Sequence, residues 1–338
     1  MPITQKFPRY ALSIVLSCFL AFSCADDKEK VRTDIKASEL TLVETPQFNA
    51  DTAYQFIEKQ LSFGPRVPNT EAHQACGQFL MAQLEEYGAK VISQNFEKKA
   101  YDGTVLNGNN IIASFNEAAK KRILLCAHWD TRHIADKDSD YRPEQEVPQL
   151  LGANDGASGV AVLLELARLL SRKDTVLQNL GVDIILFDLE DYGSPETGEG
   201  YCLGSQHWSK NKHKENYSAY YGILLDMIAG KGSVFVYEDI SYKYGRTILK
   251  NIWSIANAMG YSELFLKKRV SERIIDDHYF LNVEAKIPTI DIIGYSPVND
   301  NFFHESWHTR QDNMEVIDKG LLKKVGQVLI QTLYQESQ

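Results

Sequence analysis

The chain is poor in cysteine and in clustered basic residues, and each shortage excludes a class of protein. Its 338 residues include 5 cysteines, none of them in a Cys-x-x-Cys pair, which argues against a zinc finger or ribbon. No long basic run occurs, and 45 acidic residues outnumber 36 basic ones, giving a net charge of -9. Because phosphate binding requires clustered Lys and Arg, no nucleic-acid partner is expected.

Proline and glycine are also few, at 10 and 21 residues, which excludes a fibrous or low-complexity protein. The composition that remains, 44% hydrophobic and 24% charged, is typical of a folded soluble chain. The length allows one large domain or two ordinary ones.

One apolar run lies at the N-terminus, over residues 10–22, and follows two basic residues. It is too short to cross a bilayer and is typical of a secretory signal. Small residues just before Cys24 resemble a bacterial lipoprotein cleavage box, so we predict a lipoprotein signal peptide over 1–24, with Cys24 as the candidate lipidated residue. The alternative is a plain signal peptide cut nearby. A charged tether is predicted over 25–50.

These features predict an exported protein, either periplasmic or attached to the outer membrane as a lipoprotein. The expected contact with the membrane is through the lipid anchor only. Of the remaining cysteines, Cys76, Cys126 and Cys202, the sequence leaves open whether any two are paired.

From residue 51 onward, helical and strand-like patterns alternate. The predicted helices cover 51–60, the stretch between Thr70 and Gly88, 159–170, 242–259 and 318–334. The predicted strands cover 91–96, 110–115, 122–127, 182–187, 221–225 and 289–293. Several of these strands are apolar on both faces, and with amphipathic helices between them they indicate an α/β fold, an α/β/α sandwich around a mostly parallel central β-sheet. No linker divides 51–338, which we predict to be a single catalytic domain.

Polar side chains follow the predicted strands at the points where ligands bind in open α/β sheets. The residues concerned are His128, Asp130, Asp155, Glu190, Asp191 and Asp226, and two further candidates, Asp276 and His308, come late in the chain. Carboxylates brought together repel one another unless a cation holds them, and carboxylate oxygen with imidazole nitrogen suits zinc. The alternative is a set of independent helix caps and salt bridges. For Asp183, Asp188 and His133 taken singly, a structural role is the better prediction.

Five segments resemble, in order, the metal and catalytic positions of the zinc-dependent aminopeptidases of the M28 type. They are His128-Trp129-Asp130, the loop 152–159 around Asp155, Glu190-Asp191, Asp226 and His308-Thr309. Within that superfamily, the segment 307–313 resembles the WHTxxDN segment of animal-type glutaminyl cyclases, and Asp276-Asp277-His278 resembles their DDH segment. The sequence is therefore most similar to bacterial lipoprotein members of this type II cyclase group.

The resemblance implies a glutaminyl-peptide cyclotransferase, which converts the N-terminal glutamine of peptides and proteins to pyroglutamate and releases ammonia. It also implies one Zn²⁺ per chain that polarises the γ-carbonyl of the glutamine. The implied roles are zinc ligands for Asp155, Asp191 and His308, general base and acid for Glu190, a carboxylate pair for Asp226 and Asp276, and a substrate-binding wall for Trp307.

The main alternative is a two-zinc aminopeptidase, which would add His128 and Asp226 as ligands. A catalytically inactive binding lipoprotein would require the loss of Glu190 or of a ligand, and none is missing. Two positions depart from the cyclase pattern, because Asp191 replaces a usual glutamate and Asp291 a histidine. The segment 193–201 also differs from the animal enzymes. The sequence leaves open the roles of His128, Asp130 and Asp291.

Overall fold

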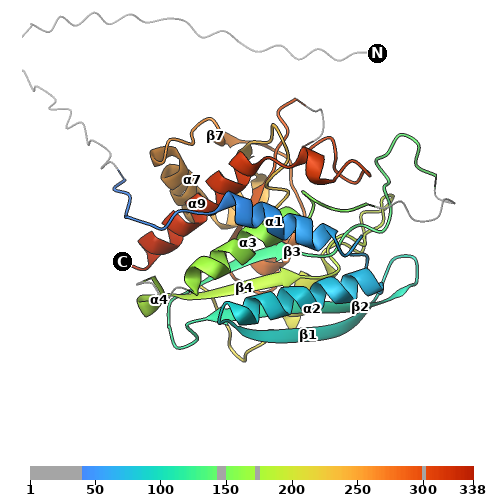
Figure 1. The fold of residues 1–338 in the computed structure, drawn as a ribbon, viewed down its shortest axis with the longest axis horizontal. Helices are drawn as coiled ribbons and strands as arrows, with labels where there is room; N and C mark the ends of the chain where they lie inside the picture. The colour runs from blue at the N-terminus through green and yellow to red at the C-terminus, as the bar shows by residue number, and fades with distance from the viewer. Residues whose placement is uncertain (1–39, 143–149, 172–175, 299–301) are drawn as a thin grey trace, which may run out of the picture. The chain divides into compact units, whose positions relative to one another are not determined.

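A six-stranded sheet with the order β1-β2-β4-β3-β5-β8 forms the centre of the fold (Figure 1). The computed structural model describes residues 40–142, 150–171, 176–298 and 302–338. In this sheet β4, β3, β5 and β8 are parallel, and β1 and β2 are antiparallel at one edge. The strands are β1 Lys90–Lys99, β2 Val105–Phe115, β3 Arg122–His128, β4 Gly181–Phe187, β5 Tyr221–Asp226 and β8 Thr289–Ile293. The predicted mostly parallel sheet is confirmed.

Helices cover both faces of the sheet, as an α/β/α sandwich requires. One face packs against α1 Ala50–Leu61, α2 Glu71–Glu86, α3 Ala157–Leu170, α7 Arg246–Ala258 and α9 Lys319–Glu336. The other face packs against α5 Leu203–Lys210 and α8 Asp277–Val283. Alternate residues of β3 face the two layers, with Leu125 in the first core and Leu124 in the second. This alternation explains why the strand is apolar throughout.

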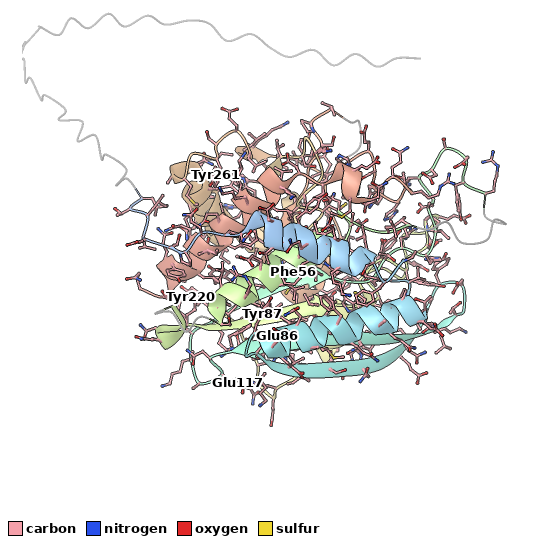
Figure 2. The ribbon with its side chains drawn as sticks, in the orientation of Figure 1. Phe56, Glu86, Tyr87, Glu117, Tyr220 and Tyr261 are labelled. Atoms are coloured by element: carbon pink, nitrogen blue, oxygen red, sulfur yellow. The ribbon has the colours of Figure 1, made fainter. Side chains whose placement is uncertain are left out.

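The first layer begins with two helices that start at side-chain caps. Asn49 accepts hydrogen bonds from the backbone at the start of α1, and Thr70 does the same for α2. Phe56 on α1 and Tyr87 after α2 make an edge-to-face ring contact at 6.5 Å (Figure 2). The remaining elements are the short helices α4 Val176–Asn179 and α6 Asp239–Tyr244, the 3₁₀ helix η1 Met314–Val316, and a two-stranded sheet of β6 Phe235–Tyr237 and β7 Phe265–Arg269.

The helix predicted over 242–259 is wrong as a single element, because the structure has α6 and α7 there. The break lies at Gly245, where the chain passes close to β8. A Cβ atom at this position would lie 2.5 Å from Ile290 Cγ2. Only glycine, which has no Cβ atom, allows that approach. Two further helices of the structure, α5 and α8, were not predicted from the sequence.

The tether predicted over 25–50 is also not free along its whole length. The compact unit begins at Leu40, and the backbone of Thr41, Pro46 and Phe48 is hydrogen-bonded to side chains of α9. The Phe48 side chain is buried because it packs into the first core. The predicted signal peptide and Cys24 lie outside the described residues. Among the described helices, none combines the length and the apolar character that a membrane span needs.

A buried ion pair fixes the start of β3 to β4. The Asp183 carboxylate, fully buried, accepts from Arg122 Nε at 2.6 Å and Nη2 at 2.7 Å, and also from Ser114 and Tyr217. The structural role predicted for Asp183 agrees with these contacts.

Replacing Arg122 by Met is expected to lower the free energy of unfolding by about 3–5 kcal/mol, because Asp183 then keeps a buried charge without its cation. Lys90→Met is the matched control, since Lys90 pairs with Glu117 at 3.3 Å with 61% of its side chain exposed. That change should cost less than about 1 kcal/mol. Urea unfolding of both variants measures the two losses in the free energy of unfolding. Equal losses would contradict the larger contribution that we assign to the buried pair.

Candidate metal centre and active site

The carboxyl ends of β3, β4 and β5 bring the predicted site residues to one edge of the sheet. His128 is the last residue of β3 and Asp226 the last of β5. Glu190 and Asp191 follow β4, and Asp155 lies in the loop before α3. Because neighbouring parallel strands end together, these side chains meet although they are far apart in sequence.

Three of the residues form a group that is suited to a metal ion. Asp155, Asp191 and His308 each offer a ligand atom, and these atoms lie within 4.8 Å of one another. His308 Nε2 lies 3.1 Å from Asp191 Oδ1 and 3.9 Å from Asp155 Oδ2. Asp191 Oδ2 is buried without a hydrogen-bond partner among the described residues, which is the state expected of an atom that binds a cation. The donor set of two carboxylates and one imidazole fits zinc.

A second group shares Asp155 with the first. His128 Nε2 lies 3.0 Å from Asp155 Oδ1 and 3.3 Å from Asp226 Oδ1. These three residues also lie within the distance that a metal ion can bridge. The geometry of the described residues therefore accommodates one metal or two. The pKa of His128 is raised well above its usual value, because the carboxylates of Asp130, Asp155 and Asp226 that surround the ring outweigh the opposing effect of burial.

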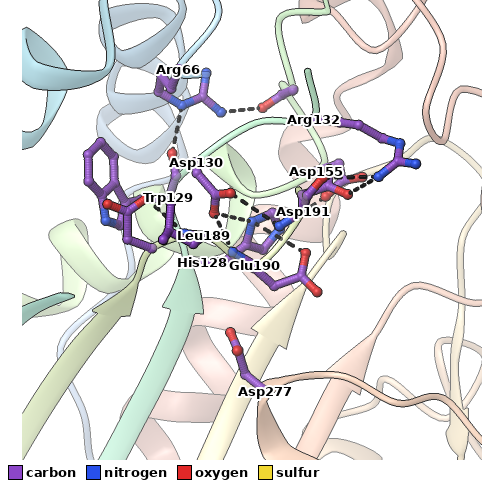
Figure 3. A network of polar contacts seen from close by, with 12 residues as sticks. Arg66, His128, Trp129, Asp130, Arg132, Asp155, Leu189, Glu190, Asp191 and Asp277 are labelled. Atoms are coloured by element: carbon purple, nitrogen blue, oxygen red, sulfur yellow. Dashed lines mark hydrogen bonds and ion pairs between the residues drawn. The ribbon is translucent and has the colours of Figure 1, made fainter. Parts of the chain in front are cut away.

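Two buried aspartates hold the backbone that carries the ligands. The Asp130 carboxylate accepts from the backbone N–H groups of Glu190 and Asp191, each at 3.1 Å (Figure 3). The Asp312 carboxylate accepts in the same way from Asn154 at 2.8 Å and from Asp155 at 3.0 Å. Each aspartate thus fixes one ligand loop through two charge-assisted hydrogen bonds. This arrangement gives Asp130, whose role the sequence left open, a positioning role.

Two arginines also hold the backbone around the metal ligands. Arg66 is fully buried and donates to the carbonyl of Trp129 (Figure 3). It also donates to the carbonyls of Leu151 and Gly152. Arg132 donates to the Asp191 carbonyl at 3.0 Å.

Asp136 lies between Arg132 and His308 and is paired with both. Its Oδ1 lies 3.2 Å from His308 Nδ1, so the imidazole presents Nε2 to the metal group. Arg66, Arg132, Asp136 and Asp312 were not predicted from the sequence. Of these, only Asp312 carried a signal, because it lies in the segment 307–313.

The backbone near the ligands adopts a conformation that is rare for side chains other than glycine. Leu189, Met227 and His308 have φ angles of 57°, 48° and 58°. Leu189 immediately precedes Glu190, and Met227 immediately follows Asp226. Such conformations cost free energy and persist where surrounding contacts enforce them, often at functional sites.

The seven residues to which the family resemblance assigns a role all line one cavity of about 390 Å³, a size within the range of small-ligand pockets. They are Asp155, Glu190, Asp191, Asp226, Asp276, Trp307 and His308. The Trp307 ring stacks on the His308 ring at 3.9 Å between centroids, and the Phe303 ring lies tilted against it at 4.3 Å. Tyr201, from the segment that departs from the animal cyclases, also lines the cavity. The cavity therefore combines a metal group, a flat aromatic wall and three further carboxyl groups.

The three carboxyl groups that are outside the proposed ligand set all have raised pKa values. Burial raises the pKa of Glu190 well above its usual value, and the nearby charge of Asp191 adds to this. Burial, together with the charge of Asp276, raises the pKa of Asp226 to about 7. Burial also raises the pKa of Asp276. No hydrogen bond joins Asp226 to Asp276 in the described part of the chain, so a proton shared between them stays a prediction.

The residues to which we assigned structural roles have partners away from the cavity. Asp188 pairs with His73 at 2.8 Å, and His133 stacks on Tyr192 at 3.8 Å. Cys76, Cys126 and Cys202 are free, buried thiols, so none of them is paired.

Asp291, at the position of the cyclases' histidine, is buried beside His278, with 3.8 Å between its Oδ2 and His278 Nδ1. Ligand atoms of Asp276, His278 and Asp291 lie within 4.8 Å of one another, and of these residues Asp276 lines the cavity. The replacement therefore keeps a polar residue in this buried cluster.

Residues 110–333 match peptidase family M28. The chain belongs to this family. Among solved structures, the glutaminyl cyclase of Bacteroides thetaiotaomicron, bound to N-acetylhistamine, is 48% identical with a TM-score of 0.81, and the match covers 86% of this chain and 99% of that one. A Zn-dependent exopeptidase from Parabacteroides distasonis is 46% identical with a TM-score of 0.82 over the same shares of both chains. The predicted resemblance to the M28 superfamily and its cyclases is confirmed.

A curated relative, the glutaminyl-peptide cyclotransferase of Gloydius blomhoffii, is 24% identical over 246 residues, which cover 65% of this chain. This chain spans 63% of the length of that relative. The relatives of this chain thus include proteins named as glutaminyl cyclases and proteins named as exopeptidases. The residues of the site must decide between these two activities.

Proposed function

We propose that this protein is a glutaminyl-peptide cyclotransferase, which closes the N-terminal glutamine of a peptide to pyroglutamate and releases ammonia. The observation that carries the proposal is the single cavity in which Trp307 and Asp276 accompany the group Asp155–Asp191–His308. Hydrolysis by an aminopeptidase gives neither Trp307 nor Asp276 a task. A solved structure named as a glutaminyl cyclase, 48% identical to this chain over 99% of its own length, supports the same choice.

One zinc ion would be held by Asp155, Asp191 and His308, and their buried, partly unpartnered ligand atoms fit such an ion. When bound, zinc supplies a Lewis acid that polarises the γ-carbonyl of the substrate glutamine. The chain orients this ligand set through Asp130, Asp136 and Asp312, which hold the backbone or ring of each ligand.

Glu190 is the general base and then the general acid of the reaction. Its carboxylate takes a proton from the substrate's α-ammonium group and later returns one to the departing ammonia. The raised pKa of Glu190 suits a group that must both accept and release a proton. Its side chain is 14% exposed, so it reaches the cavity where the peptide N-terminus binds.

Asp226 and Asp276 hold the α-amine and the amide nitrogen from the other side of the cavity. Two close carboxyl groups do not both ionise easily, so one acts as donor and the other as acceptor. Trp307 provides a flat wall that places the glutamine side chain for ring closure. Since the attack is intramolecular, positioning contributes most of the rate enhancement.

The direct test is mass spectrometry of a Gln-initiated peptide after incubation with the protein. Loss of ammonia from an otherwise intact peptide is the expected result. Release of the first residue as a free amino acid would instead establish the two-zinc aminopeptidase. A peptide with N-terminal Asn is the control, because its shorter side chain cannot form the five-membered ring.

The zinc content distinguishes the same two readings. We expect one equivalent of zinc per chain after dialysis against metal-free buffer, and the same content in His128→Asn, because His128 is not a proposed ligand. Asp191→Ala, which removes a proposed ligand, should lose the metal. Two equivalents in the unmodified protein that fall to one in His128→Asn would overturn the mono-zinc proposal. Plasma emission spectrometry on the three proteins gives the answer.

We also propose, from the sequence alone, that the chain is exported and anchored through lipid on Cys24. Mass spectrometry of the mature N-terminal peptide tests this. An unmodified N-terminus at any other residue would contradict the anchor.

A further inference from the structure

A buried thiol that has no part in the proposed reaction lies directly beside Glu190. Cys202 Sγ donates to Glu190 Oε1 at 3.2 Å, and the Cys202 side chain is completely buried. The backbone fixes this arrangement, because the Cys202 N–H donates to the Glu190 carbonyl at 2.8 Å. Residues 190 and 202 are therefore held side by side, with the thiol of one next to the carboxylate of the other.

Asp276 brings a third ligand atom to the same place. One of its oxygens, Oδ1, accepts from the backbone N–H of Asp277, whereas Oδ2 is buried and has no hydrogen-bond partner among the described residues. Asp276 is 5% exposed. Ligand atoms of Glu190, Cys202 and Asp276 all lie within 4.8 Å of one another, which is close enough for one ion to contact all three.

We propose that Glu190, Cys202 and Asp276 form an inhibitory site for a second divalent cation that prefers thiolate, such as Cd²⁺ or excess Zn²⁺. The site is separate from the ligand set Asp155–Asp191–His308, with which it shares no residue. On binding, the Cys202 thiol loses its proton to solvent and its sulfur forms a bond to the cation. The two carboxylates complete three ligands, and the fourth position faces the cavity.

The chemistry of the donors determines which cation binds. Among the groups of described residues that could hold a metal, this group contains the sulfur ligand, and soft thiolate favours Zn²⁺ and Cd²⁺ over Mg²⁺ or Ca²⁺. A cation reaches it through the cavity, because Glu190 and Asp276 both line that space. Once bound, it occupies the carboxylate that we propose as general base, so turnover stops while the catalytic zinc stays in place.

Binding at this site does not depend on the reaction, whereas the inhibition rests on the proposed function. The experiment therefore measures both on the full zinc-loaded chain titrated with CdCl₂. One signal is the ultraviolet charge-transfer band of a cadmium thiolate, and the other is the rate of pyroglutamate formation. A chromogenic zinc indicator in the same cuvette records any zinc that cadmium displaces.

Cys202→Ser is the decisive variant, because serine keeps a hydroxyl donor to Glu190 but is a poor ligand for cadmium. Cys76→Ser is the matched control, since Cys76 is an equally buried thiol on α2 and belongs to none of the metal groups found among the described residues. Each rate is compared with that of the same variant without cadmium. Circular dichroism verifies the fold. Asp276→Asn, followed only through the band, provides a second test if Cys202→Ser does not fold.

For the unmodified protein and for Cys76→Ser we expect the band and the inhibition to saturate together, without release of zinc. Cys202→Ser should lose the band and require at least about tenfold more cadmium for half-inhibition. Asp276→Asn should keep the band at saturation but need at least about tenfold more cadmium to reach it.

Three outcomes overturn the inhibitory site. They are no cadmium-thiolate band in the unmodified protein, equal sensitivity of Cys202→Ser, or zinc release that parallels the inhibition. A protein that shows the band but forms no pyroglutamate at any cadmium concentration would instead refute the proposed function and leave the metal site intact.

Discussion

Glu190→Gln is expected to lower the rate of pyroglutamate formation by about 10²–10⁴-fold while the zinc stays bound. Glutamine keeps the shape of the side chain but cannot accept a proton at neutral pH. The zinc ligands are unaffected because the hydrogen bond from the Glu190 backbone N–H to Asp130 involves no side-chain atom of residue 190. Steady-state kinetics with a Gln-initiated peptide, together with metal analysis of the same sample, measures both quantities.

Glu196→Gln is the matched control for this variant. Glu196 lies in the same loop after β4, is exposed, and does not line the cavity. Its replacement should leave the rate within about twofold, because a substitution at an exposed residue outside the cavity seldom changes the structure of the site. Near-normal turnover of Glu190→Gln would mean that another group moves the proton, and the role of Glu190 would have to be withdrawn.

Asp276→Asn is expected to reduce cyclisation strongly, with the fold and the zinc content unchanged. In the structure Asp276 caps α8 through Oδ1, and asparagine caps a helix about as well as aspartate. The substitution therefore removes the carboxyl at Oδ2 while it keeps the cap. A neutral residue at 276 no longer raises the pKa of Asp226, so that pKa falls below its value of about 7. The pair then lacks the matched donor and acceptor.

The measurement is the pH profile of the cyclisation rate, which should drop and shift as the ionisation of Asp226 moves to lower pH. Asp318→Asn is the control, because Asp318 caps α9 in the same way and lies outside the cavity. If Asp276→Asn retained full activity with an unaltered profile and a normal melting temperature, the carboxylate pair would have no place in the mechanism. Trp307 and the relatives named as cyclases would then be the remaining support for a cyclase over a two-zinc aminopeptidase.

The pattern of the sequence was sufficient to predict the central sheet and the residues at its edge. The apolar strand at 122–127 and the polar residues that follow it are local features, and the geometry of parallel strands brings such ends together. The sequence alone therefore predicts that Glu190, Asp191 and Asp226 lie near one another. The family resemblance gave roles to Asp276, Trp307 and His308, none of which directly follows a predicted strand.

The supporting layer could not be predicted, because its contacts join residues that are distant in the chain. Asp312 accepts from the backbone of Asp155, 157 residues earlier, and Arg66 holds the carbonyl of Gly152 from 86 residues away. In a sequence, a buried arginine or aspartate looks the same as an exposed one. Their burial and partners are set by how α1, α3 and the loops pack on the sheet.

The break between α6 and α7 has the same origin. Gly245 within a helical pattern is compatible with one long helix, and only the position of Ile290 on β8 makes the close approach necessary. The pairing of Cys202 with Glu190 likewise depends on the loop after β4 folding back onto α5. Local patterns thus determined the helices and strands and which polar side chains stand at the strand ends. Long-range packing decided which other side chains orient those polar groups, neutralise their charge and fix their backbone.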